Sequence, residues 1–276
     1  MNPKRVAIIG SGYIGTELAI YWAKKGYEIT ATTSSPKKIK LLSKIVQKTA
    51  LYKGSADGVI AQILLENDAI ILTLSANRHG DIEQTFLSTA RFIKSCALEM
   101  QTPKTLIYTS NCSVYGNHHG LWVNEKSPLL ATTLEGKILI ETESCYLSLI
   151  DLGWQVCILR LSDIYGPGRE ISKKIKDLQG KVLSGSGENF TNMVHEEDVV
   201  HAIDYSLQRE LKGVYNLSDN DHPKQKEFYD MISKRFHLTP PIWDASQHPL
   251  NGNKRISHNR IIKEGFRFTY PHRLMI

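Results

Sequence analysis

The sequence predicts an α/β protein with a Rossmann-like, doubly wound parallel sheet and a small C-terminal α/β lobe. Apolar runs of strand length alternate with helical patterns from Val6 onward, which is typical of a parallel sheet. A glycine-rich turn follows the first of these runs. Past Gly166 the alternation is lost, so we expect a second, smaller lobe there.

The composition is that of an ordinary globular protein. The chain has 276 residues, of which 41% are hydrophobic and 22% are charged. Its net charge of +6 suits an anionic nucleotide as well as a nucleic acid. The Lys and Arg residues are scattered, apart from runs at 37–40 and 173–176 that we interpret as solvated faces. Nucleic-acid binding would require a clustered basic face, so we do not expect it.

No pattern in the sequence indicates a membrane, secretion or a metal site. We find no secretory signal before the first strand and no apolar run long enough to span a bilayer. The cysteines form no Cys-x-x-Cys pair, so free thiols in a reducing cytoplasm are the simple interpretation. The pair His118-His119 lacks carboxylate or thiol neighbours at metal spacing, and we predict a surface loop.

The first strand and the first helix are predicted on either side of the glycine-rich turn. The run 6–9 is apolar, glycines follow at G-x-G-x-x-G spacing, and a helical pattern then continues to Gly26. In this arrangement the first glycine permits a tight turn, the second lets the backbone approach a pyrophosphate, and the third lets the helix pack close to the sheet. The helix N-terminus also attracts phosphate. The predicted dinucleotide contacts are Gly10, Gly12, Tyr13, Ile14 and Gly15. The alternative is a glycine-rich turn without a ligand.

The end of the second strand, predicted over 27–32, favours NADP over NAD. A fold that prefers NAD carries a carboxylate there for the ribose 2′-hydroxyl. No acid is present here, and Thr33, Ser34 and Lys37 are able to bind a 2′-phosphate instead. The alternative is that Ser35-Pro36 only starts the next helix.

The following elements continue the alternation of strands and helices. We predict helices at 36–47, 57–66, 82–100 and 134–152, and strands at 49–52, 68–74 and 104–109. Ligands of open α/β sheets lie beyond the carboxyl ends of strands. Leu74, Ser75 and Ala76 should therefore line the cofactor.

Five segments further along resemble a known family. Tyr-Thr-Ser-Asn-Cys-Ser-Val-Tyr-Gly stands at 108–116 and Leu-Arg-Leu-Ser-Asp-Ile-Tyr-Gly-Pro-Gly-Arg at 159–169. Asn-Met-Val-His-Glu-Glu-Asp-Val-Val stands at 192–200, Gly-Val-Tyr-Asn-Leu-Ser at 213–218, and Asn-Lys-Arg-Ile-Ser at 253–257. In this order they resemble the extended short-chain dehydrogenase/reductases, the nucleotide-sugar epimerase and dehydratase family. The resemblance covers nearly the whole chain and implies NAD(P) as cofactor.

The resemblance also implies three catalytic groups, two of which are altered. The family uses a Tyr as general acid/base, a Lys four residues later that lowers the pKa of the Tyr, and a Ser or Thr. Lys137 fits the Lys position, but Thr133 stands at the Tyr position. Asn111 stands at the Ser/Thr position, beside Ser110. The chain is therefore similar to the atypical branch of the family. We expect Ser110, Asn111 and Lys137 nearest the chemistry.

Other residues receive weaker roles from the same resemblance. Lys137 either holds the nicotinamide ribose or is a solvated helix residue. Tyr115 and Tyr165 follow strand ends and are possible substitutes for the missing Tyr, although Tyr115 in Val-Tyr-Gly more often packs as structure. His195 and Asp198 fit a structural turn better than a catalytic one.

We predict two domains that interleave in sequence. The NAD(P)-binding domain takes 1–168 together with 192–218, and the substrate lobe takes 169–191 and 219–276. The lobe is expected to hold helices at 170–180 and 224–236, a hairpin at 180–187 and a loop at 240–253. By family analogy its cations meet an anionic substrate, the alternative being ordinary surface charge. These cations are Arg169, Lys254 and Arg255.

The predicted function is that of an NAD(P)-dependent oxidoreductase or a nucleotide-sugar epimerase/dehydratase-like enzyme that lacks the usual catalytic Tyr. It would transfer hydride at a carbonyl or carbinol carbon of a small, anionic or sugar-like substrate. Proton transfer would use Thr133 through a water, or a substrate group. The alternative is a redox sensor or assembly protein that binds NADP(H) without turning it over, which the missing Tyr supports. The family also implies a possible homodimer through the helix that carries Lys137.

Overall fold

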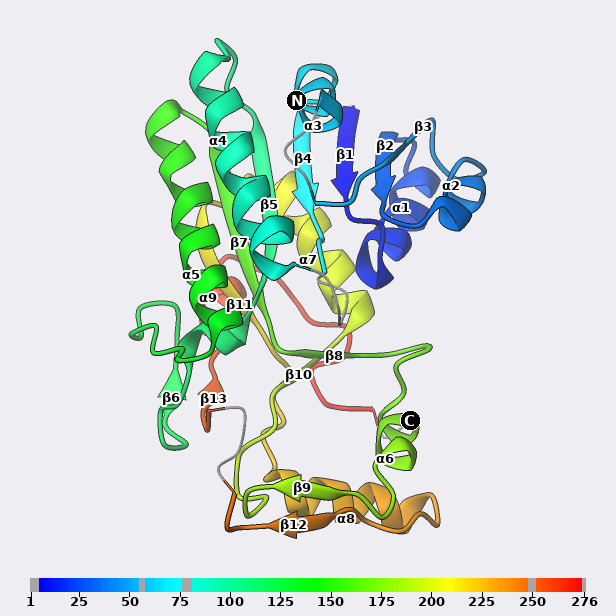
Figure 1. Ribbon diagram of the computed structural model, residues 1–276, viewed down its shortest axis with the longest axis vertical. Helices are drawn as coiled ribbons and strands as arrows, with labels where there is room; N and C mark the ends of the chain where they lie inside the picture. The colour runs from blue at the N-terminus through cyan, green and yellow to red at the C-terminus, as the bar shows by residue number, and fades with distance from the viewer. Residues whose placement is uncertain (1–4, 55–57, 76–80, 248–251, 275–276) are drawn as a thin grey trace. The chain divides into compact units, whose positions relative to one another are not determined.

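The computed structural model describes residues 5–54, 58–75, 81–247 and 252–274. Its main sheet comprises β1 (Arg5–Ile9), β2 (Glu28–Thr33), β3 (Lys48–Leu51), β4 (Ala69–Leu72), β5 (Thr105–Asn111), β7 (Gln155–Leu161) and β11 (Gly213–Leu217). The order of these seven strands is β11-β7-β5-β4-β1-β2-β3 (Figure 1). From β1 the chain runs outward through β2 and β3 and then crosses to the other side for β4 and β5. This reversal confirms the predicted Rossmann-like, doubly wound sheet.

The central strands are apolar because both of their faces are covered. The strands β1 and β4 pair in parallel, with Ile8 beside Ile71, and β1 pairs in parallel with β2, with Ile8 beside Ala31. All three side chains are fully buried. A continuous apolar run, rather than an alternating one, is typical of such doubly covered parallel strands.

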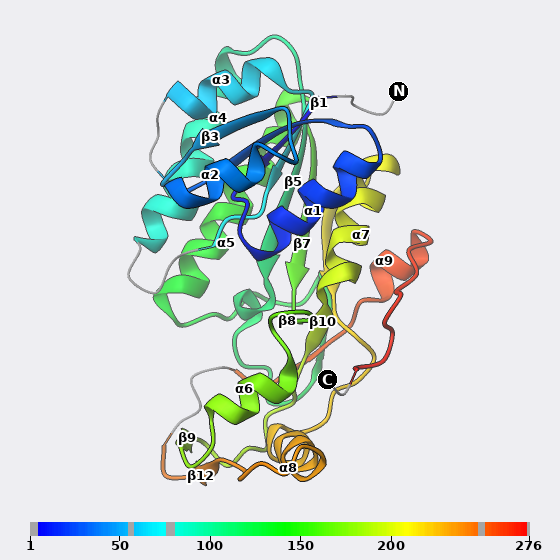
Figure 2. The ribbon, with the colours of Figure 1, turned by 90° about the vertical axis from the view of Figure 1, so that its right-hand side faces the viewer.

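Helices cover both faces of this sheet. They are α1 (Tyr13–Lys24), α2 (Pro36–Leu42), α3 (Gly58–Glu66), α4 (Thr89–Glu99), α5 (Leu134–Leu147) and α7 (Glu196–Gln208). Figure 2 shows α1 and α7 on one face and α3, α4 and α5 on the other. The buried Asp204 of α7 accepts hydrogen bonds from Trp22 Nε1 and Lys25 Nζ of α1, each at 2.7 Å. These bonds fix α1 against α7.

Three predicted helices differ from the observed ones. The helix predicted at 36–47 ends at Leu42, and a series of turns leads into β3. The helix predicted at 82–100 begins with a π-helical turn, Gln84–Ser88, where Thr85 and Thr89 hydroxyls bond to carbonyls four residues earlier. In the segment predicted as a helix at 134–152, α5 ends at Leu147 and a 3-10 turn continues to Leu152. This turn ends there because Gly153 adopts a φ of +82°.

The chain forms two compact units. Unit 1 consists of Met1–Ser110, Thr133–Leu159 and Val200–Val214, and unit 2 consists of Asn111–Thr132, Arg160–Val199 and Tyr215–Ile276. Both units are assembled from segments that are far apart in sequence. The predicted functional division, with a cofactor domain over 1–168 and 192–218, remains a prediction.

Unit 2 has short strands and helices around its own apolar core. The shorter elements are β6 (Trp122–Val123), β8 (Asp163–Tyr165), α6 (Ile171–Asp177), β9 (Val182–Ser184), β10 (Met193–His195), α8 (Gln225–Arg235), β12 (Ile242–Asp244), β13 (Arg255–Ile256) and α9 (Asn259–Lys263). The core contains Tyr165, Ile171, Ile175, Met193, Phe228, Tyr229 and Ile232.

The predicted hairpin at 180–187 is wrong, and so is the prediction that 240–253 is entirely loop. The strand β9 pairs in parallel with β12, with Leu183 beside Trp243. Both of these side chains pack against the core of unit 2, whereas Val182 and Ile242 are exposed. The partner of β9 lies about sixty residues away, so the turn residues near Gly180 do not reveal the pairing.

Candidate functional site

The glycine-rich turn of unit 1 is tied to the ends of two neighbouring strands. Gly10 N donates to Thr32 Oγ1 at 3.0 Å, and Ser11 N donates to Thr32 O at 2.6 Å, both at the end of β2. Thr73 Oγ1, just after β4, donates to Gly10 O at 2.8 Å. The carboxyl ends of β1, β2 and β4 therefore meet at the turn. Sequence analysis did not select Thr32 or Thr73. The position of each hydroxyl side chain at the end of a strand could have indicated them.

The reason for glycine differs among the three positions of the motif. Gly10 has a φ of +99°, and a Cβ there would lie 2.9 Å from Thr73 O. A Cβ at Gly15 would lie 2.5 Å from Gly10 O and 2.6 Å from Thr73 Oγ1. At Gly12 the nearest atom would be Ser75 Oγ at 3.6 Å, which is an ordinary contact. The fold itself thus requires Gly10 and Gly15, whereas Gly12 leaves a space that a side chain would fill.

The start of α1 has the features of a phosphate site. Gly12 is its N-cap and supplies no side-chain cap, and its first turn contains no acidic residue. Ser11 Oγ is buried and has no hydrogen-bond partner among the described residues. The space at Gly12 and the unpaired Ser11 hydroxyl both fit a dinucleotide, whose pyrophosphate needs close backbone approach and hydrogen-bond donors. Tyr13 is half-buried and Ile14 is buried on α1.

The residues selected for a 2′-phosphate lie after β2, and a neighbour joins them. Thr33 is buried and its Oγ1 accepts a hydrogen bond from Ser35 N at 3.2 Å, whereas Ser34 and Lys37 are exposed. Lys38 Nζ donates to Ser11 O at 3.5 Å. Lys38 is therefore a lysine of α2 whose ammonium group lies at the glycine turn. Sequence analysis missed it because adjacent lysines in one basic run give no sign of which one faces the site.

The segment after β4 also borders the turn. A Cβ at Gly10 would lie 3.1 Å from Leu74 Cα, and Ser75 Oγ is the nearest atom to the space at Gly12. Leu74 is half-buried and Ser75 is exposed. The third residue predicted here, Ala76, lies outside the described residues.

Ser110 is joined to a buried carboxylate that sequence analysis did not select. Ser110 Oγ donates to Glu143 Oε1 at 2.6 Å, from the end of β5 to the middle of α5. Glu143 is 2% exposed, although neighbouring acidic positions of α5 face solvent. Burying a carboxylate is costly unless it is paired, so this pair is built into the interface between β5 and α5. The signal available in the sequence was an acidic residue on the apolar face of the helix.

Thr133 and Lys137 occupy the first turn of α5. Thr133 is the N-cap, and its Oγ1 accepts a hydrogen bond from Gly136 N at 3.1 Å. Lys137 is exposed, and its backbone N–H bonds to Thr133 O at 3.1 Å. The residue at the usual Tyr position therefore begins the helix.

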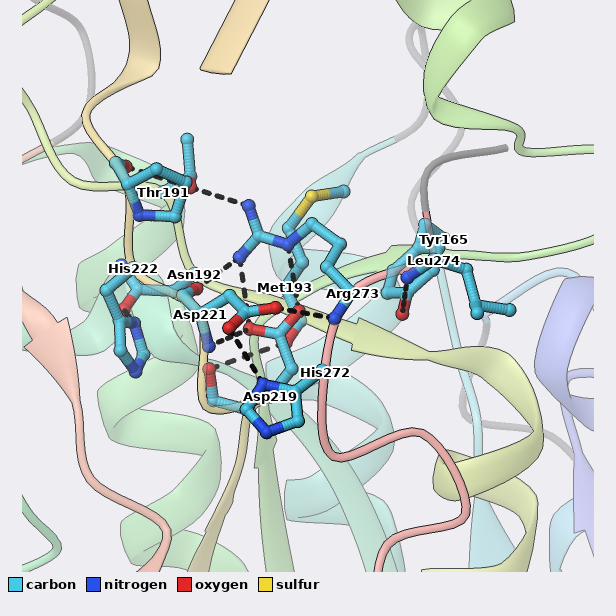
Figure 3. Close-up of polar contacts among 12 residues, drawn as sticks. Tyr165, Thr191, Asn192, Met193, Asp219, Asp221, His222, His272, Arg273 and Leu274 are labelled. Carbon is cyan, nitrogen blue, oxygen red and sulfur yellow. Dashed lines mark hydrogen bonds and ion pairs between the residues drawn. The ribbon is translucent and has the colours of Figure 1, made fainter. Parts of the chain in front are cut away.

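The remaining candidates for acid/base catalysis lie in unit 2 and are already paired. Asn111 is exposed and its side chain accepts a hydrogen bond from Ser113 N at 2.6 Å. Tyr115 OH donates to Asn216 Oδ1 at 2.7 Å, and burial raises the pKa of Tyr115 well above its usual value. Tyr165 OH accepts a hydrogen bond from Leu274 N at 3.2 Å (Figure 3), and burial raises the pKa of Tyr165 to about 12.

His195 and Asp198 make the contacts of a structural turn. His195 Nδ1 accepts a hydrogen bond from Glu197 N at 3.2 Å, and burial lowers the pKa of His195. The fully buried carboxylate of Asp198 accepts hydrogen bonds from Thr269 N at 2.6 Å and Tyr270 N at 3.0 Å. These contacts hold the C-terminal segment to unit 2.

The three cations selected for an anionic substrate differ in their surroundings. Arg169 is exposed. Lys254 is only 7% exposed and its Nζ donates to Gly116 O at 3.2 Å, so the alternative of an ordinary surface charge is wrong for this residue. Burial lowers the pKa of Lys254. The Arg255 guanidinium lies over the rings of Trp122 and Phe190, at 5.1 and 4.8 Å from their centroids.

The described residues contain neither a metal-binding cluster nor a membrane-spanning helix. Within these residues no three His, Cys, Asp or Glu side chains are grouped so as to hold a metal ion. Within the same residues no helix combines the length and the apolar composition needed to cross a membrane.

A family comparison decides the identity of the fold. The model of the NAD dependent epimerase/dehydratase family matches residues 6–218. The chain belongs to this family. The resemblance seen in the sequence is thereby confirmed at the level of the family. Protein YeeZ of Escherichia coli strain K12 is 31% identical over 283 residues, which is 99% of this chain and 98% of YeeZ.

Solved structures show the same fold at lower identity. A dTDP-glucose 4,6-dehydratase from Bacillus anthracis, in complex with NAD, has a TM-score of 0.81 at 16% identity over 96% of this chain and 92% of that chain. MoeE5, in complex with UDP-glucuronic acid and NAD, has a TM-score of 0.77 at 18% identity over 96% of this chain and 93% of that chain. These structures show the fold, and the coarse assignment to an oxidoreductase or epimerase-like family member rests on the family model.

Proposed function

We propose that this family member binds NADP(H) in preference to NAD(H) and acts as an oxidoreductase or as an epimerase/dehydratase-like enzyme. The observation that carries the proposal is the space at Gly12, where the fold places no demand for glycine but a dinucleotide does. When bound, the nicotinamide supplies the hydride chemistry. The protein supplies binding, orientation and proton transfer.

Each part of unit 1 near the turn has a binding role in this proposal. The backbone at Gly12 and the N-terminus of α1 approach the pyrophosphate, and the Ser11 hydroxyl donates to it. Lys38, Ser34 and Thr33 bind the 2′-phosphate, and no acidic residue stands at the end of β2 to repel it. Lys37 was the lysine chosen from the sequence, but the contact of Lys38 with the turn favours Lys38.

Proton transfer in the proposed reaction uses groups other than a Tyr. Ser110, Asn111 and Lys137 remain the candidates nearest the reacting atoms, and Glu143 orients the Ser110 hydroxyl. The Thr133 hydroxyl accepts the N-cap bond and keeps its proton free to donate, so it is able to act through a water. A substrate group is the remaining source of a proton.

The proposed substrate is a small sugar-like or anionic molecule. MoeE5 was solved with UDP-glucuronic acid, which supports this class of ligand by analogy. Arg169 and Arg255 are the cations proposed to meet it. We keep a homodimer through α5 as a prediction. A cytoplasmic location agrees with the four free cysteines.

A second candidate function rests on the pairing of the hydroxyl groups. Thr133 caps α5, and both Tyr115 and Tyr165 are buried and hydrogen-bonded, which makes each a poor base. These observations favour a sensor or assembly protein that binds NADP(H) without turnover. The two functions differ in one measurement, hydride transfer that depends on Ser110 and Lys137.

The proposal is tested first by titration of the purified protein with NADPH and with NADH, followed by calorimetry or nucleotide fluorescence. We expect tighter binding of NADPH and loss of binding in Gly12→Val, whose side chain fills the phosphate space. Lys38→Ala should weaken the binding of NADPH about tenfold or more and leave the binding of NADH nearly unchanged, because it removes a charge-assisted contact to the 2′-phosphate.

Lys37→Ala is the matched control for this titration, since it removes the same charge one residue away. Equal weakening of NADPH by both variants would assign the effect to net charge and not to Lys38. No binding of either nucleotide at millimolar concentration would overturn the proposal. Binding without turnover in a screen of carbonyl substrates would favour the sensor.

A further inference from the structure

Unit 2 contains a pocket of about 400 Å³ that the proposed function does not use. It is formed by β6 and the residue after it, by the loop 220–222 and by the segment 256–259. None of the residues lining it belongs to the cofactor or catalytic candidates described above. Its volume lies in the range of small-molecule sites.

Two rings form a corner of this pocket. Trp122 is 54% exposed, which is unusual for an indole, and the His222 ring stands almost perpendicular to it, at 83° and 4.9 Å between centroids. The Arg255 guanidinium packs over Trp122 and donates from Nε to Gly120 O at 3.0 Å. The indole is thus held in place without being covered.

The His222 ring is fixed by the half-buried side-chain amide of Asn192. His222 Nδ1 lies 2.9 Å from Asn192 Oδ1, which also accepts a hydrogen bond from Ile256 N at 2.8 Å. Because Asn192 Oδ1 accepts, His222 Nδ1 carries the proton. Asn192 Nδ2 donates to Lys254 O at 3.0 Å, which fixes the orientation of the amide. Figure 3 shows His222 and Asn192 side by side.

A buried ion pair supports the loop that carries His222. The Arg273 guanidinium bonds to both oxygens of Asp219 at 2.9 and 3.0 Å and to Thr191 Oγ1 at 2.7 Å (Figure 3). Both charged side chains are completely buried. Such a pair adds little stability relative to apolar packing, but it fixes geometry. Here it joins the segment before Asn192 to the segment before His222 and keeps the corner rigid.

The chemistry of the lining selects a neutral polar ligand. The polar residues Asn124, Asn220, Ser257 and Asn259 line the pocket together with the apolar Val123 and Ile256. Among the described lining residues none carries a formal charge at neutral pH, because burial lowers the pKa of His222 to about 4 and also lowers that of His258. A charged ligand would lose its hydration without a counter-charge.

The shape of the corner separates two classes of neutral ligand. A flat base or ring system is best held between parallel planes, whereas these two rings are perpendicular. A pyranose in its chair form has an apolar face for the indole and hydroxyls around its edge for amides and an imidazole. We propose that this pocket is a second binding site, which takes one neutral pyranose ring with its apolar face on Trp122. The described lining contains none of the residues assigned to the proposed function; Arg255, a proposed substrate contact, enters only by packing over Trp122.

The test uses the purified full chain and three neutral probes, the methyl glycosides of glucose, galactose and N-acetylglucosamine. Saturation-transfer NMR and tryptophan fluorescence report binding. We expect at least one probe to bind with a millimolar Kd, and Trp122→Ala to weaken it about tenfold or more. Leu121→Ala is the matched control, since it truncates the exposed residue immediately before β6 and should leave binding unchanged.

Three further binding measurements test the proposed site. Asn220→Ala should also weaken binding of the probe. Because Asn220 is exposed, this variant still tests the site if Trp122→Ala does not fold. Methyl glucuronide, the charged isostere, should bind more weakly than methyl glucoside. Saturating NADPH should leave probe binding unchanged. No binding of any neutral probe at about 10 mM, tighter binding of the glucuronide, or competition by NADPH would each overturn the proposal.

Discussion

At the scale of single residues, glycines that look equivalent in the motif separate into two kinds. Gly10 and Gly15 are needed because a Cβ would meet backbone or hydroxyl atoms, and Gly10 also has a positive φ. Gly12 meets nothing closer than an ordinary contact. Stability and ligand binding should therefore respond to different members of one motif.

The first residue-scale prediction compares Gly15→Ala with Gly12→Ala. Gly15→Ala should lower the free energy of unfolding by about 2–3 kcal/mol, because the new Cβ overlaps the Gly10 carbonyl and the Thr73 hydroxyl. Gly12→Ala should change it by less than about 1 kcal/mol. Urea unfolding measures both values. Equal destabilisation would show that the space at Gly12 is not real.

The second residue-scale prediction concerns the buried carboxylate. Glu143→Ala should lower the free energy of unfolding by about 2–3 kcal/mol, since it removes the bond to Ser110 and leaves a cavity between α5 and β5. Glu141→Ala, on the same helix but exposed, should change it by less than about 0.5 kcal/mol. Similar effects of the two changes in a urea series would argue against a built-in pair.

The candidate site is predictable from the sequence where it depends on residue spacing, and is not predictable where it depends on side-chain direction. The glycine turn and the absence of a carboxylate after β2 can be read from the amino-acid sequence alone. The choice between Lys37 and Lys38 was not, because it depends on the angle at which α2 leaves β2. Glu143 falls on the apolar face of α5 between Leu139 and Tyr146, and this spacing was the one sign of its burial in the sequence.

At the scale of elements, α1 and α7 are joined by a single carboxylate. Asp204 accepts hydrogen bonds from Trp22, Lys25 and Gln208, and Trp22 is fully buried. Trp22 and Asp204 are 182 positions apart in the sequence. Their docking depends on polar contacts that hydrophobic periodicity does not predict.

The element-scale prediction is that Asp204→Ala lowers the free energy of unfolding by about 3 kcal/mol. The change leaves the buried indole N–H of Trp22 without its acceptor and removes the partner of Lys25. Glu17→Ala, at an exposed position of α1, is the control and should be nearly neutral. Thermal or urea unfolding measures the difference. A loss below about 1 kcal/mol for Asp204→Ala would contradict the assigned role.

The elements themselves were predicted with uneven success for a physical reason. Strands of the main sheet are buried on both faces, so their apolar runs were legible from local sequence. The strands β9 and β12 have only three residues each and pair across a long separation, so neither carried a local signal. The π-helical turn before α4 arises from threonine hydroxyls and not from any change in periodicity.

At the scale of the whole molecule, three imidazoles of unit 2 link stability to pH; His195 is buried, and His222 and His258 are half-buried. Burial lowers the pKa values of His195, His222 and His258, and that of His222 falls to about 4. An unfolded imidazole titrates near 6.5. Between these two values the unfolded chain binds a proton that the folded chain does not, so stability must fall as the pH drops through this window.

The whole-molecule prediction is a loss of unfolding free energy between pH 6.5 and 4, of which His222 accounts for about 2–3 kcal/mol. His222→Asn should flatten the pH dependence of urea unfolding over this window. His237→Asn is the control, because His237 is exposed and asparagine tolerates its φ of +54°. An unchanged slope in His222→Asn would show that this imidazole does not titrate between the two states.

The buried pair of Arg273 with Asp219 has a consequence for the timing of folding. The two partners are 54 positions apart, and Arg273 belongs to the last described segment of the chain. While the chain is being synthesised, Asp219, Asp221 and Thr191 are all made before the guanidinium that pairs with them. Unit 2 therefore completes this part of its polar interior only after Arg273 has emerged from the ribosome, and until then Asp219 lacks the guanidinium that pairs with it in the folded chain.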